Sequence, residues 1–426
     1  MIVQGIVFGI SFFNILVGVI FFVLYFYQFV YVIIPFVKKR KPHKREVIHN
    51  IGILISARNE EAVIGHLIDS IEAQDYPKGK LRIFVVADNC TDKTADICRG
   101  RGAIVYERFN RERIGKGYAL DFLITNIDKE FGLSSVDAFI VLDADNILDT
   151  EYVRSMNRML CDGYNVSTSY RNSKNYCDNW ISAAYALWFM REARFLNNSR
   201  FLLGTSCAVS GTGFMFSREL IERLGGWKFF LLTEDIEFTV NCILSGEKIG
   251  YCDDAVLYDE QPITIEQSWN QRLRWSKGFL QVWSKYGSRL VRGIFRGSFS
   301  CFDMTMTVCP AYLISILSII FDLLGIGLCY LTGNLQLVGG LVTLIVAALI
   351  EAYLLFFTMA LITLISEWKN IHCRAHKKIT YLFSFPIFLI SYMPVSLVAL
   401  FKKVEWKPID HTRSVTIEDI KRRRKK

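Results

Sequence analysis

The sequence predicts an α/β domain with a mostly parallel sheet, flanked by transmembrane and interfacial helices. Three observations carry this prediction. Short apolar runs alternate with helical patterns between residues 50 and 145, as in sheets whose strands are joined by crossover helices. Residues 5–37 contain no Lys, Arg, Asp or Glu, and further long apolar runs fill the C-terminal third. A membrane span needs about 20 apolar residues, so both regions are long enough.

The pattern divides the chain into six segments. They are an N-terminal transmembrane helix (1–37), a basic linker (38–49), a cytosolic α/β domain (50–265), amphipathic interface helices (266–303), a C-terminal membrane region (304–402) and a basic cytosolic tail (403–426).

The N-terminal apolar segment lacks the marks of a secretory signal peptide. Such a peptide has a basic start, a shorter apolar core and a small-residue cleavage site. We therefore expect a retained transmembrane helix. The run Lys38-Lys39-Arg40-Lys41 directly after it indicates that this end faces the cytosol. The protein is then expected to be a multi-pass protein of the cell membrane, with its α/β domain in the cytosol.

The C-terminal third is expected to hold two membrane helices, residues 304–331 and 335–366. Residues 379–401 are also apolar but contain Pro386 and Pro394. A third crossing would carry the basic tail outside, against the positive-inside rule. We therefore favour a re-entrant or interfacial segment, which requires that protein covers the broken backbone.

The net charge of +9 is concentrated in two basic runs, residues 38–45 and 421–426. Each run follows an apolar stretch, where anionic lipid headgroups are the expected partner. Membrane lipid is therefore predicted, and nucleic acid is not. The 11 cysteines contain no Cys-x-x-Cys pair and mostly have apolar neighbours. We expect them to be reduced and buried, as in a cytosol-facing domain.

Polar residues follow three of the predicted strands. Asn59 and Glu60 follow residues 51–56, Asp88 follows residues 81–87, and Asp143 and Asp145 follow residues 139–142. Ligands of such sheets bind outside the carboxyl ends of the strands, so this coincidence predicts a site.

Asp143-Ala144-Asp145 can bind a hard cation. Carboxylate oxygens suit Mg²⁺ or Mn²⁺, whose remaining ligands are often substrate phosphates and water. The alternative is a capped loop. Lys116 lies between two glycines and can reach a diphosphate, or it is a solvated loop lysine.

Two further groups lie later in the chain. Glu234 and Asp235 precede a helical pattern, so they are either helix-capping acids or a carboxylate general base. After a gap of 35 residues come Gln271, Arg274 and Trp275 on a basic amphipathic helix. They either anchor the membrane interface or line an acceptor channel and bind phosphate. The aromatic-rich helix at 178–196 is either core packing or a stacking wall for sugar rings.

Taken in this order, these motifs resemble the membrane-embedded family 2 glycosyltransferases, which include cellulose, chitin, hyaluronan and poly-N-acetylglucosamine synthases. The resemblance covers residues 50–290. It implies a GT-A-like nucleotide-sugar domain. It assigns nucleotide-sugar binding to Asn59, Glu60, Asp88, Lys116 and Asp143, and metal binding to Asp145 with Asp143. It assigns catalysis to Asp235 with Glu234. It assigns binding of the acceptor and the diphosphate to Gln271, Arg274 and Trp275.

The resemblance further implies an inverting, metal-dependent hexosyl- or N-acetylhexosaminyltransferase. Such an enzyme uses a UDP-sugar to extend a β-linked polysaccharide, and the growing glycan can be passed through the membrane. The alternative is a non-processive transferase that moves one sugar to a lipid-linked acceptor. A non-catalytic membrane scaffold with this fold is the third possibility. The stretch with Trp406, Pro408, His411 and Thr412 is either a gate over the site or a simple tail.

Overall fold

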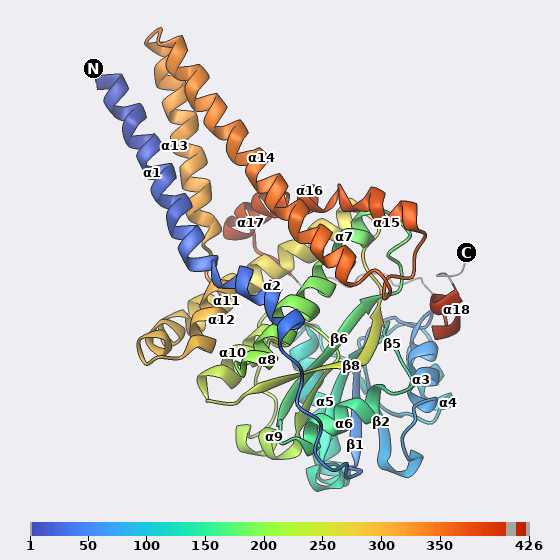
Figure 1. The fold of residues 1–426 in the computed structure, drawn as a ribbon. Helices are drawn as coiled ribbons and strands as arrows, with labels where there is room; N and C mark the ends of the chain where they lie inside the picture. The colour runs from blue at the N-terminus through green and yellow to red at the C-terminus, as the bar shows by residue number, and fades with distance from the viewer. Residues whose placement is uncertain (1, 406–414, 423–426) are drawn as a thin grey trace.

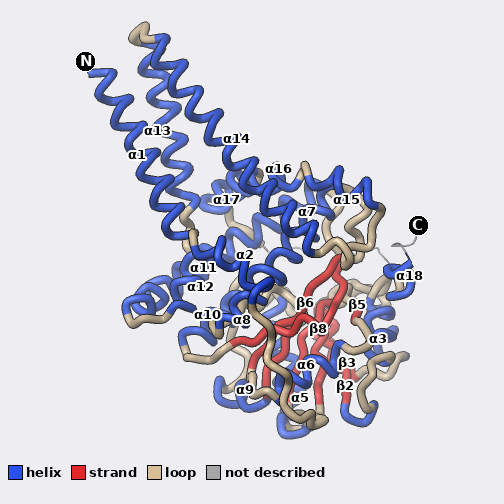
Figure 2. The backbone as a smooth tube through the Cα atoms, in the orientation of Figure 1, coloured by secondary structure: helices blue, strands red, loops and turns tan. Residues whose placement is uncertain are grey.

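The computed structural model describes residues 2–405 and 415–422. A bundle of long helices projects from one side of an α/β domain, and the N-terminus lies at the far end of this bundle (Figure 1). Among the described residues, the strands lie in the domain and the projecting part is helical (Figure 2).

An eight-stranded sheet forms the centre of the domain, in the order β3-β2-β1-β4-β7-β6-β8-β5. The first four strands are parallel. β7 is antiparallel to both neighbours, while β6 and β8 are parallel to each other. The predicted mostly parallel α/β sheet is confirmed. The strands are β1 Ile51–Ala57, β2 Leu81–Asp88, β3 Ile104–Arg108, β4 Ala138–Asp143, β5 Ile147–Leu148, β6 Val166–Ser173, β7 Phe214–Ser217 and β8 Ile249–Asp259.

Helices cover both faces of this sheet, which explains why its parallel strands are apolar at consecutive positions. Ile53 of β1 packs in one core with α3 and α6. Leu54, its neighbour, faces the other core with α5. The helices of the domain are α3 Ile64–Glu72, α4 Thr94–Gly100, α5 Lys116–Phe131, α6 Tyr152–Cys161, α7 Trp180–Arg191, α8 Asn198–Leu203, α9 Arg218–Leu224 and α10 Glu234–Leu244.

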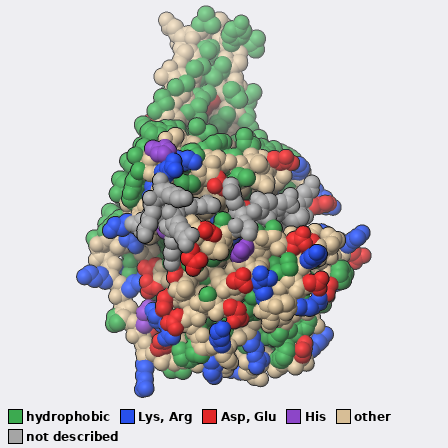
Figure 3. Space-filling view, turned by 90° about the vertical axis from the view of Figure 1, so that its right-hand side faces the viewer, with side chains coloured by type: hydrophobic (Ala, Val, Ile, Leu, Met, Phe, Trp, Pro, Cys, Tyr) green, Lys and Arg blue, Asp and Glu red, His purple; other side chains and the backbone are tan. Residues whose placement is uncertain are grey.

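Within the described ranges, three segments are long and apolar enough to cross a membrane: Ile2–Val37, Tyr312–Leu331 and Leu335–Ser366. The first comprises α1 (Ile2–Tyr25) and α2 (Tyr27–Val37), and the others are α13 and α14. A bent pair of helices, Ala375–Leu382 and Phe385–Phe401, would make a fourth if it forms one span. Hydrophobic side chains dominate the projecting bundle, whereas charged side chains gather on the domain (Figure 3). The predicted helix at 304–331 begins later than expected, because residues 304–308 belong to α12 (Phe299–Val308) and the helix breaks before α13.

The fourth apolar stretch forms three short helices, α15 Ala375–Leu382, α16 Phe385–Ile390 and α17 Tyr392–Phe401. The chain bends by 41° between α15 and the following pair. These helices lie between the projecting bundle and the domain (Figure 1). Arg272 donates to the Phe388 carbonyl and the Ser391 hydroxyl, at 3.1 and 2.6 Å. Arg272 therefore satisfies two acceptors at the break between α16 and α17, and the re-entrant or interfacial placement of this segment stays a prediction.

The tail also returns to the domain. Ile420 of α18 (Ile417–Arg422) is buried against Ile147 and Tyr258. The described part of the tail thus lies on the same side as the catalytic domain. Trp406, Pro408, His411 and Thr412 lie outside the described residues.

One expectation about the cysteines is wrong. Cys177 and Cys373 form a disulfide although they are 196 residues apart. α7 packs against α14, α15 and α16 and brings the loops before α7 and after α14 together. The sequence shows no such proximity. The other nine cysteines are free, and six of them are buried.

Candidate active site

The residues predicted to bind the nucleotide begin at the ends of β1 and β2. Asn59 and Asn89 both adopt a φ of 55°, which is uncommon for residues other than glycine. The Asn59 side chain accepts a hydrogen bond from the Thr91 N–H at 2.8 Å, and the Glu60 N–H donates to the Thr94 hydroxyl at 2.8 Å. These bonds tie the two loops together, so the predicted Asn59 and Glu60 lie beside the end of β2.

Asp88 is the last residue of β2 and is buried. Burial raises its pKa, and the Arg108 guanidinium, 2.6 Å away, opposes that rise. Arg108 also donates to the Arg113 carbonyl at 2.5 Å. Arg108 of the neighbouring strand β3 therefore holds this carboxylate, which is predicted to bind the nucleotide-sugar, in place.

Lys116 begins α5 and reaches across to the end of β4. Its ammonium forms an ion pair with Asp143 and donates to the Gly211 carbonyl at 3.0 Å. Burial lowers the pKa of Lys116, but the charges of Asp143, Glu234 and Asp235 outweigh burial and raise it overall. The lysine therefore stays positive and close to the predicted metal carboxylates.

The Asp143-Ala144-Asp145 segment is fixed by backbone contacts. The Asp143 N–H donates to the Thr212 hydroxyl at 2.9 Å and lies 3.1 Å from the Asn146 side-chain oxygen. Asp145 is buried and accepts from the Glu260 N–H at 2.9 Å. These bonds hold both carboxylates at one edge of the sheet.

The acidic pair lies at the start of α10. Asp235 accepts from the Gly211 N–H at 2.6 Å, so Gly211 connects it to Lys116. Burial and the charge of Asp235 raise the pKa of Glu234 to about 7, although Lys116 and Arg274 lower it. Burial also raises the pKa of Asp235, against the N–H groups of Ile236 and Gly211. The site therefore holds two adjacent carboxyls that compete for ionisation.

The Gln-x-x-Arg-Trp group lies on α11 (Ile265–Phe295). Arg274 is within electrostatic reach of both acids of the pair. The Trp275 ring packs edge-on against Tyr185 and Phe189 of α7, with centroids 5.8 and 6.0 Å apart. The Gln271 side-chain oxygen is buried without a hydrogen-bond partner among the described residues. One buried hydrogen-bond acceptor on α11 therefore lacks a donor in the part of the chain that the structure describes.

The structure therefore brings most of the predicted residues into one place. Lys116, Asp143, Glu234, Asp235 and Arg274 form one electrostatic cluster around Gly211. The remaining members border this cluster: Asp145 two residues beyond Asp143, Asn59, Glu60 and Asp88 along the same strand edge, and Gln271 and Trp275 on α11.

Sequence reasoning missed two residues of this region, Arg171 on β6 and Asp259 at the end of β8. They form an ion pair, and the Arg171 guanidinium lies 3.7 Å from the centre of the Phe189 ring. Burial raises the pKa of Asp259 to about 7 even though Arg171 lowers it. A polar residue at a strand end was the available signal, but the strand itself was not predicted.

The residues fit a divalent cation whose ligands come partly from the protein and partly from a substrate. No group of three or more His, Cys, Asp or Glu side chains is arranged to hold a metal ion within 2–405 and 415–422. Asp145 and Asp143 offer one or two carboxylates at the sheet edge, beside Lys116. Mg²⁺ is typically bound by one or two carboxylates plus substrate phosphates, which matches this donor set.

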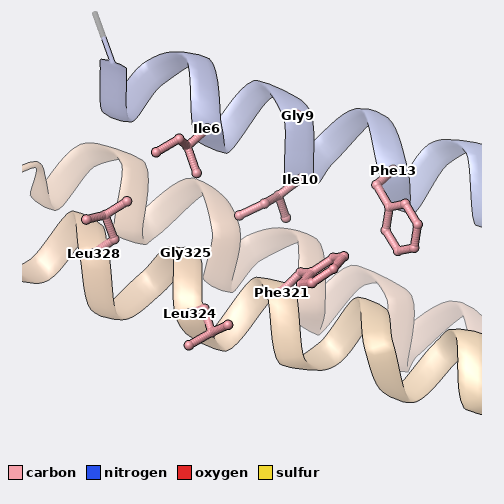
Figure 4. A pocket seen from close by; sticks show the side chains of 8 residues that line it. All are labelled: Ile6, Gly9, Ile10, Phe13, Phe321, Leu324, Gly325 and Leu328. Atoms are coloured by element: carbon pink, nitrogen blue, oxygen red, sulfur yellow. The ribbon is translucent and has the colours of Figure 1, made fainter.

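A groove elsewhere in the molecule has a different character. It has a volume of about 400 Å³ and lies between α1 and α13 in the membrane bundle (Figure 4). All of its lining residues are apolar: Ile6, Gly9, Ile10, Phe13, Phe321, Leu324, Gly325 and Leu328. It offers no group for a nucleotide.

A comparison with protein families gives the site its context. The model described as "Glycosyltransferase like family 2" matches residues 49–278, which is more than half of the chain. The chain belongs to glycosyltransferase family 2. The matched range contains every predicted site residue, from Asn59 to Trp275.

Relatives of this family 2 glycosyltransferase include the probable glycosyltransferase YdaM of Bacillus subtilis, 25% identical over 349 residues, 74% of each chain. The beta-monoglucosyldiacylglycerol synthase of Nostoc sp. is 25% identical over 62% of this chain and 56% of its own. The poly-beta-1,6-N-acetyl-D-glucosamine synthase of Staphylococcus epidermidis is 23% identical over 57% of this chain and 60% of its own. This chain thus spans less than two thirds of the last two relatives.

The solved structure of a mannosyltransferase from Pyrobaculum calidifontis, in complex with GDP-Man and Mn²⁺, has the same fold. It superposes with a TM-score of 0.58 over 94% of this chain and 99% of its own, at 16% identity. The GT-A-like fold class is therefore confirmed.

Proposed function

We propose that this family 2 glycosyltransferase transfers a hexosyl or N-acetylhexosaminyl group from a UDP-sugar to a hydroxyl group, with inversion, and so extends a β-linked polysaccharide. The observation that carries the proposal is the Gly211 junction. Its N–H binds Asp235, and its carbonyl binds Lys116, which is paired with Asp143. In this proposal, one loop residue therefore positions both the carboxylate base, Asp235, and the diphosphate-binding cation, Lys116.

In this proposal Asp235 is the general base. It removes the proton of the acceptor hydroxyl while that oxygen attacks the anomeric carbon, and the bond from this carbon to the UDP oxygen breaks. A general base must lie within hydrogen-bond reach of the proton that it removes. The Gly211 N–H fixes the carboxylate, which supports such a role. The charge of Asp235 helps to raise the pKa of Glu234, so the two carboxyls titrate as a pair.

The donor lies along the strand edge in this proposal. Asn59, Glu60 and Asp88 bind the nucleoside, while Lys116 and Asp143 bind the diphosphate. Asp145, with Asp143, would hold Mg²⁺ or Mn²⁺, which neutralises charge on the departing diphosphate when bound. Arg274 supplies a further fixed cation, and Gln271 and Trp275 line the acceptor side.

A second candidate acceptor is a lipid-linked one that receives a single sugar. The name of the Nostoc relative, a synthase of a glucosylated diacylglycerol, supports it, whereas the Staphylococcus relative is a polysaccharide synthase. We infer that either acceptor enters on the side of the membrane helices, because α11, which carries Gln271 and Trp275, packs against α17 there. We place the catalytic domain in the cytosol, because the basic linker follows the first span.

The decisive experiment uses purified full-length protein in lipid nanodiscs with Mn²⁺ or Mg²⁺. UDP release is measured with UDP-glucose, UDP-N-acetylglucosamine and UDP-glucuronate, and the products are sized by mass spectrometry. We expect turnover with one of these donors and a ladder of glycan lengths. Products carrying one added sugar would select the lipid-linked acceptor. No UDP release with any donor, and no effect of Asp235→Asn, would leave the non-catalytic scaffold.

A further inference from the structure

Glu192 is a carboxylate beside the site that neither the motifs nor the mechanism above uses. It follows α7 and begins a π-helical segment, Glu192–Asn197. Segments of this kind inside α-helices often occur at functional sites. Phe189, three residues earlier, contacts both Trp275 and Arg171. Residues three apart share a helix face, so Glu192 faces the same wall.

The contacts of Glu192 lead to the catalytic loop. Its carboxylate accepts a hydrogen bond from the Ser210 hydroxyl at 3.4 Å. The next residue, Gly211, binds Asp235 through its N–H and Lys116 through its carbonyl. Two adjacent loop residues, Ser210 and Gly211, therefore connect Glu192 to the proposed base, Asp235.

The surrounding cations are already paired. Burial raises the pKa of Glu192, Arg200 and Arg171 lower it, and the charge of Asp235 raises it. Arg200 forms a buried ion pair with Asp303, and Arg171 one with Asp259. Glu192 itself makes no ion pair with any residue of the described ranges. Among the described residues, the carboxylate accepts one hydrogen bond, from the Ser210 hydroxyl at 3.4 Å. It can therefore accept further hydrogen bonds from a ligand.

The chemistry of this position selects the ligand. A carboxylate repels a diphosphate, so Glu192 does not suit the donor. It lies toward α7, whose aromatic residues contact Trp275 of α11 and Phe388 of α16. Neutral hydroxyl groups of an acceptor satisfy a partly buried carboxylate through charge-assisted hydrogen bonds.

We propose that Glu192 is an acceptor-binding residue, whose carboxylate accepts a hydrogen bond from an acceptor hydroxyl and so orients the attacking oxygen toward Asp235. This proposal rests on the proposed transfer reaction and adds a fourth acceptor contact to Gln271, Arg274 and Trp275.

The test compares Glu192→Gln with wild-type protein in the same nanodiscs. Initial rates are measured against acceptor concentration at saturating donor, and UDP affinity is measured by calorimetry. Replacing the charge should raise the acceptor KM by about tenfold or more, because hydrogen bonds to charged groups are strong. UDP affinity should stay within about threefold, since this carboxylate does not face the donor. Glu219→Gln, on the exposed side of α9, is the matched control.

A second variant separates binding from loop support. Ser210→Ala removes the described partner of Glu192 but leaves its carboxylate in place. If Glu192 only supports the loop, Ser210→Ala will reproduce the defect of Glu192→Gln, and this result overturns the proposal. An unchanged acceptor KM in Glu192→Gln, or equal losses of donor and acceptor affinity, also overturns it. Wild-type protein that turns over no UDP-sugar defeats the proposed function itself, and the Glu192 assignment falls with it.

Discussion

Asp235 and Glu234 are neighbours in the sequence with different surroundings. Only Asp235 accepts the Gly211 N–H. We expect Asp235→Asn to retain UDP binding and to lose transfer by about 10²–10⁴-fold, the usual contribution of a general base. Calorimetry with UDP and a UDP-release assay measure the two effects. An equal loss of binding would instead make Asp235 a substrate-binding residue.

The shared proton of this pair predicts a pH dependence. Glu234 has a pKa of about 7, so the pair takes up its first proton near that pH and then carries one negative charge instead of two. Because two adjacent carboxyls share this proton, Asp235 is then ionised for only part of the time. We expect kcat to fall as the pH drops below about 7, whereas an ordinary glutamate would titrate near pH 4.5. In Glu234→Gln the acid limb should move to lower pH, because one competing charge is gone. A pH–rate profile of both proteins checks this, and identical acid limbs would remove Glu234 from the titration.

Which residues could be predicted from the sequence depended on their strands. Asp88, Asp143 and Asp145 follow apolar runs and were predicted at the sheet edge. Arg171 lies within β6 and Asp259 ends β8, and neither strand was predicted from the sequence. β6 reads Val-Ser-Thr-Ser-Tyr-Arg-Asn-Ser, and most of its polar residues are buried. Periodicity of apolar residues cannot detect such a strand.

At the scale of elements, Glu237 joins the helix of the base to the helix of the Gln-x-x-Arg-Trp group. Its fully buried carboxylate accepts from the Phe230 and Leu231 N–H groups at 2.9 and 3.0 Å. It also accepts from Lys285 and Tyr286 of α11, at 2.5 and 3.1 Å. Several donors on two elements therefore depend on one side chain.

Removing the Glu237 carboxylate should weaken the packing of α10 against α11. We expect Glu237→Ala to lower the free energy of unfolding by about 3–5 kcal/mol, because it leaves buried donors unpaired. Lys285 is half exposed, so Lys285→Ala should cost only about 1 kcal/mol or less. Thermal and denaturant unfolding of both variants in detergent measure the difference. Equal small effects would show that α10 and α11 are held by other contacts.

The loop after β4 carries the metal prediction. Chelation of divalent cations should abolish turnover, and added Mn²⁺ or Mg²⁺ should restore it, because the diphosphate needs a counter-charge. Asp145→Asn should raise the metal concentration required for half-maximal activity. Full activity in excess chelator would exclude this role for Asp145.

For the whole molecule, two connections fix the domain to the membrane region. Asp303 of α12 binds Arg200 of the domain and the hydroxyls of Tyr27 and Tyr31 of α2. The Cys177–Cys373 disulfide joins the loop before α7 to the segment after α14. Neither connection could be predicted from the sequence, because the partners lie 103 to 276 residues apart. The apolar runs themselves were sufficient to predict the helices that are long and apolar enough to cross a membrane.

The disulfide should contribute to stability. Reduction should lower the free energy of unfolding by about 2–4 kcal/mol, the typical value for such a cross-link. Thermal unfolding with and without a phosphine reductant measures the effect. Cys177→Ser is the control, and its unfolding should not respond to reductant. A wild-type protein that is equally insensitive would show that these cysteines are reduced.

α11 runs without interruption for 31 residues, about 46 Å, from the wall of the catalytic site to the rim of the domain. Near its far end it packs against α12, which is tied to the first membrane segment through Asp303. A rigid rod of this length acts as a lever. A change in bilayer thickness that tilts the first span would be transmitted to Trp275, so the catalytic rate should depend on the acyl-chain length of the surrounding lipid.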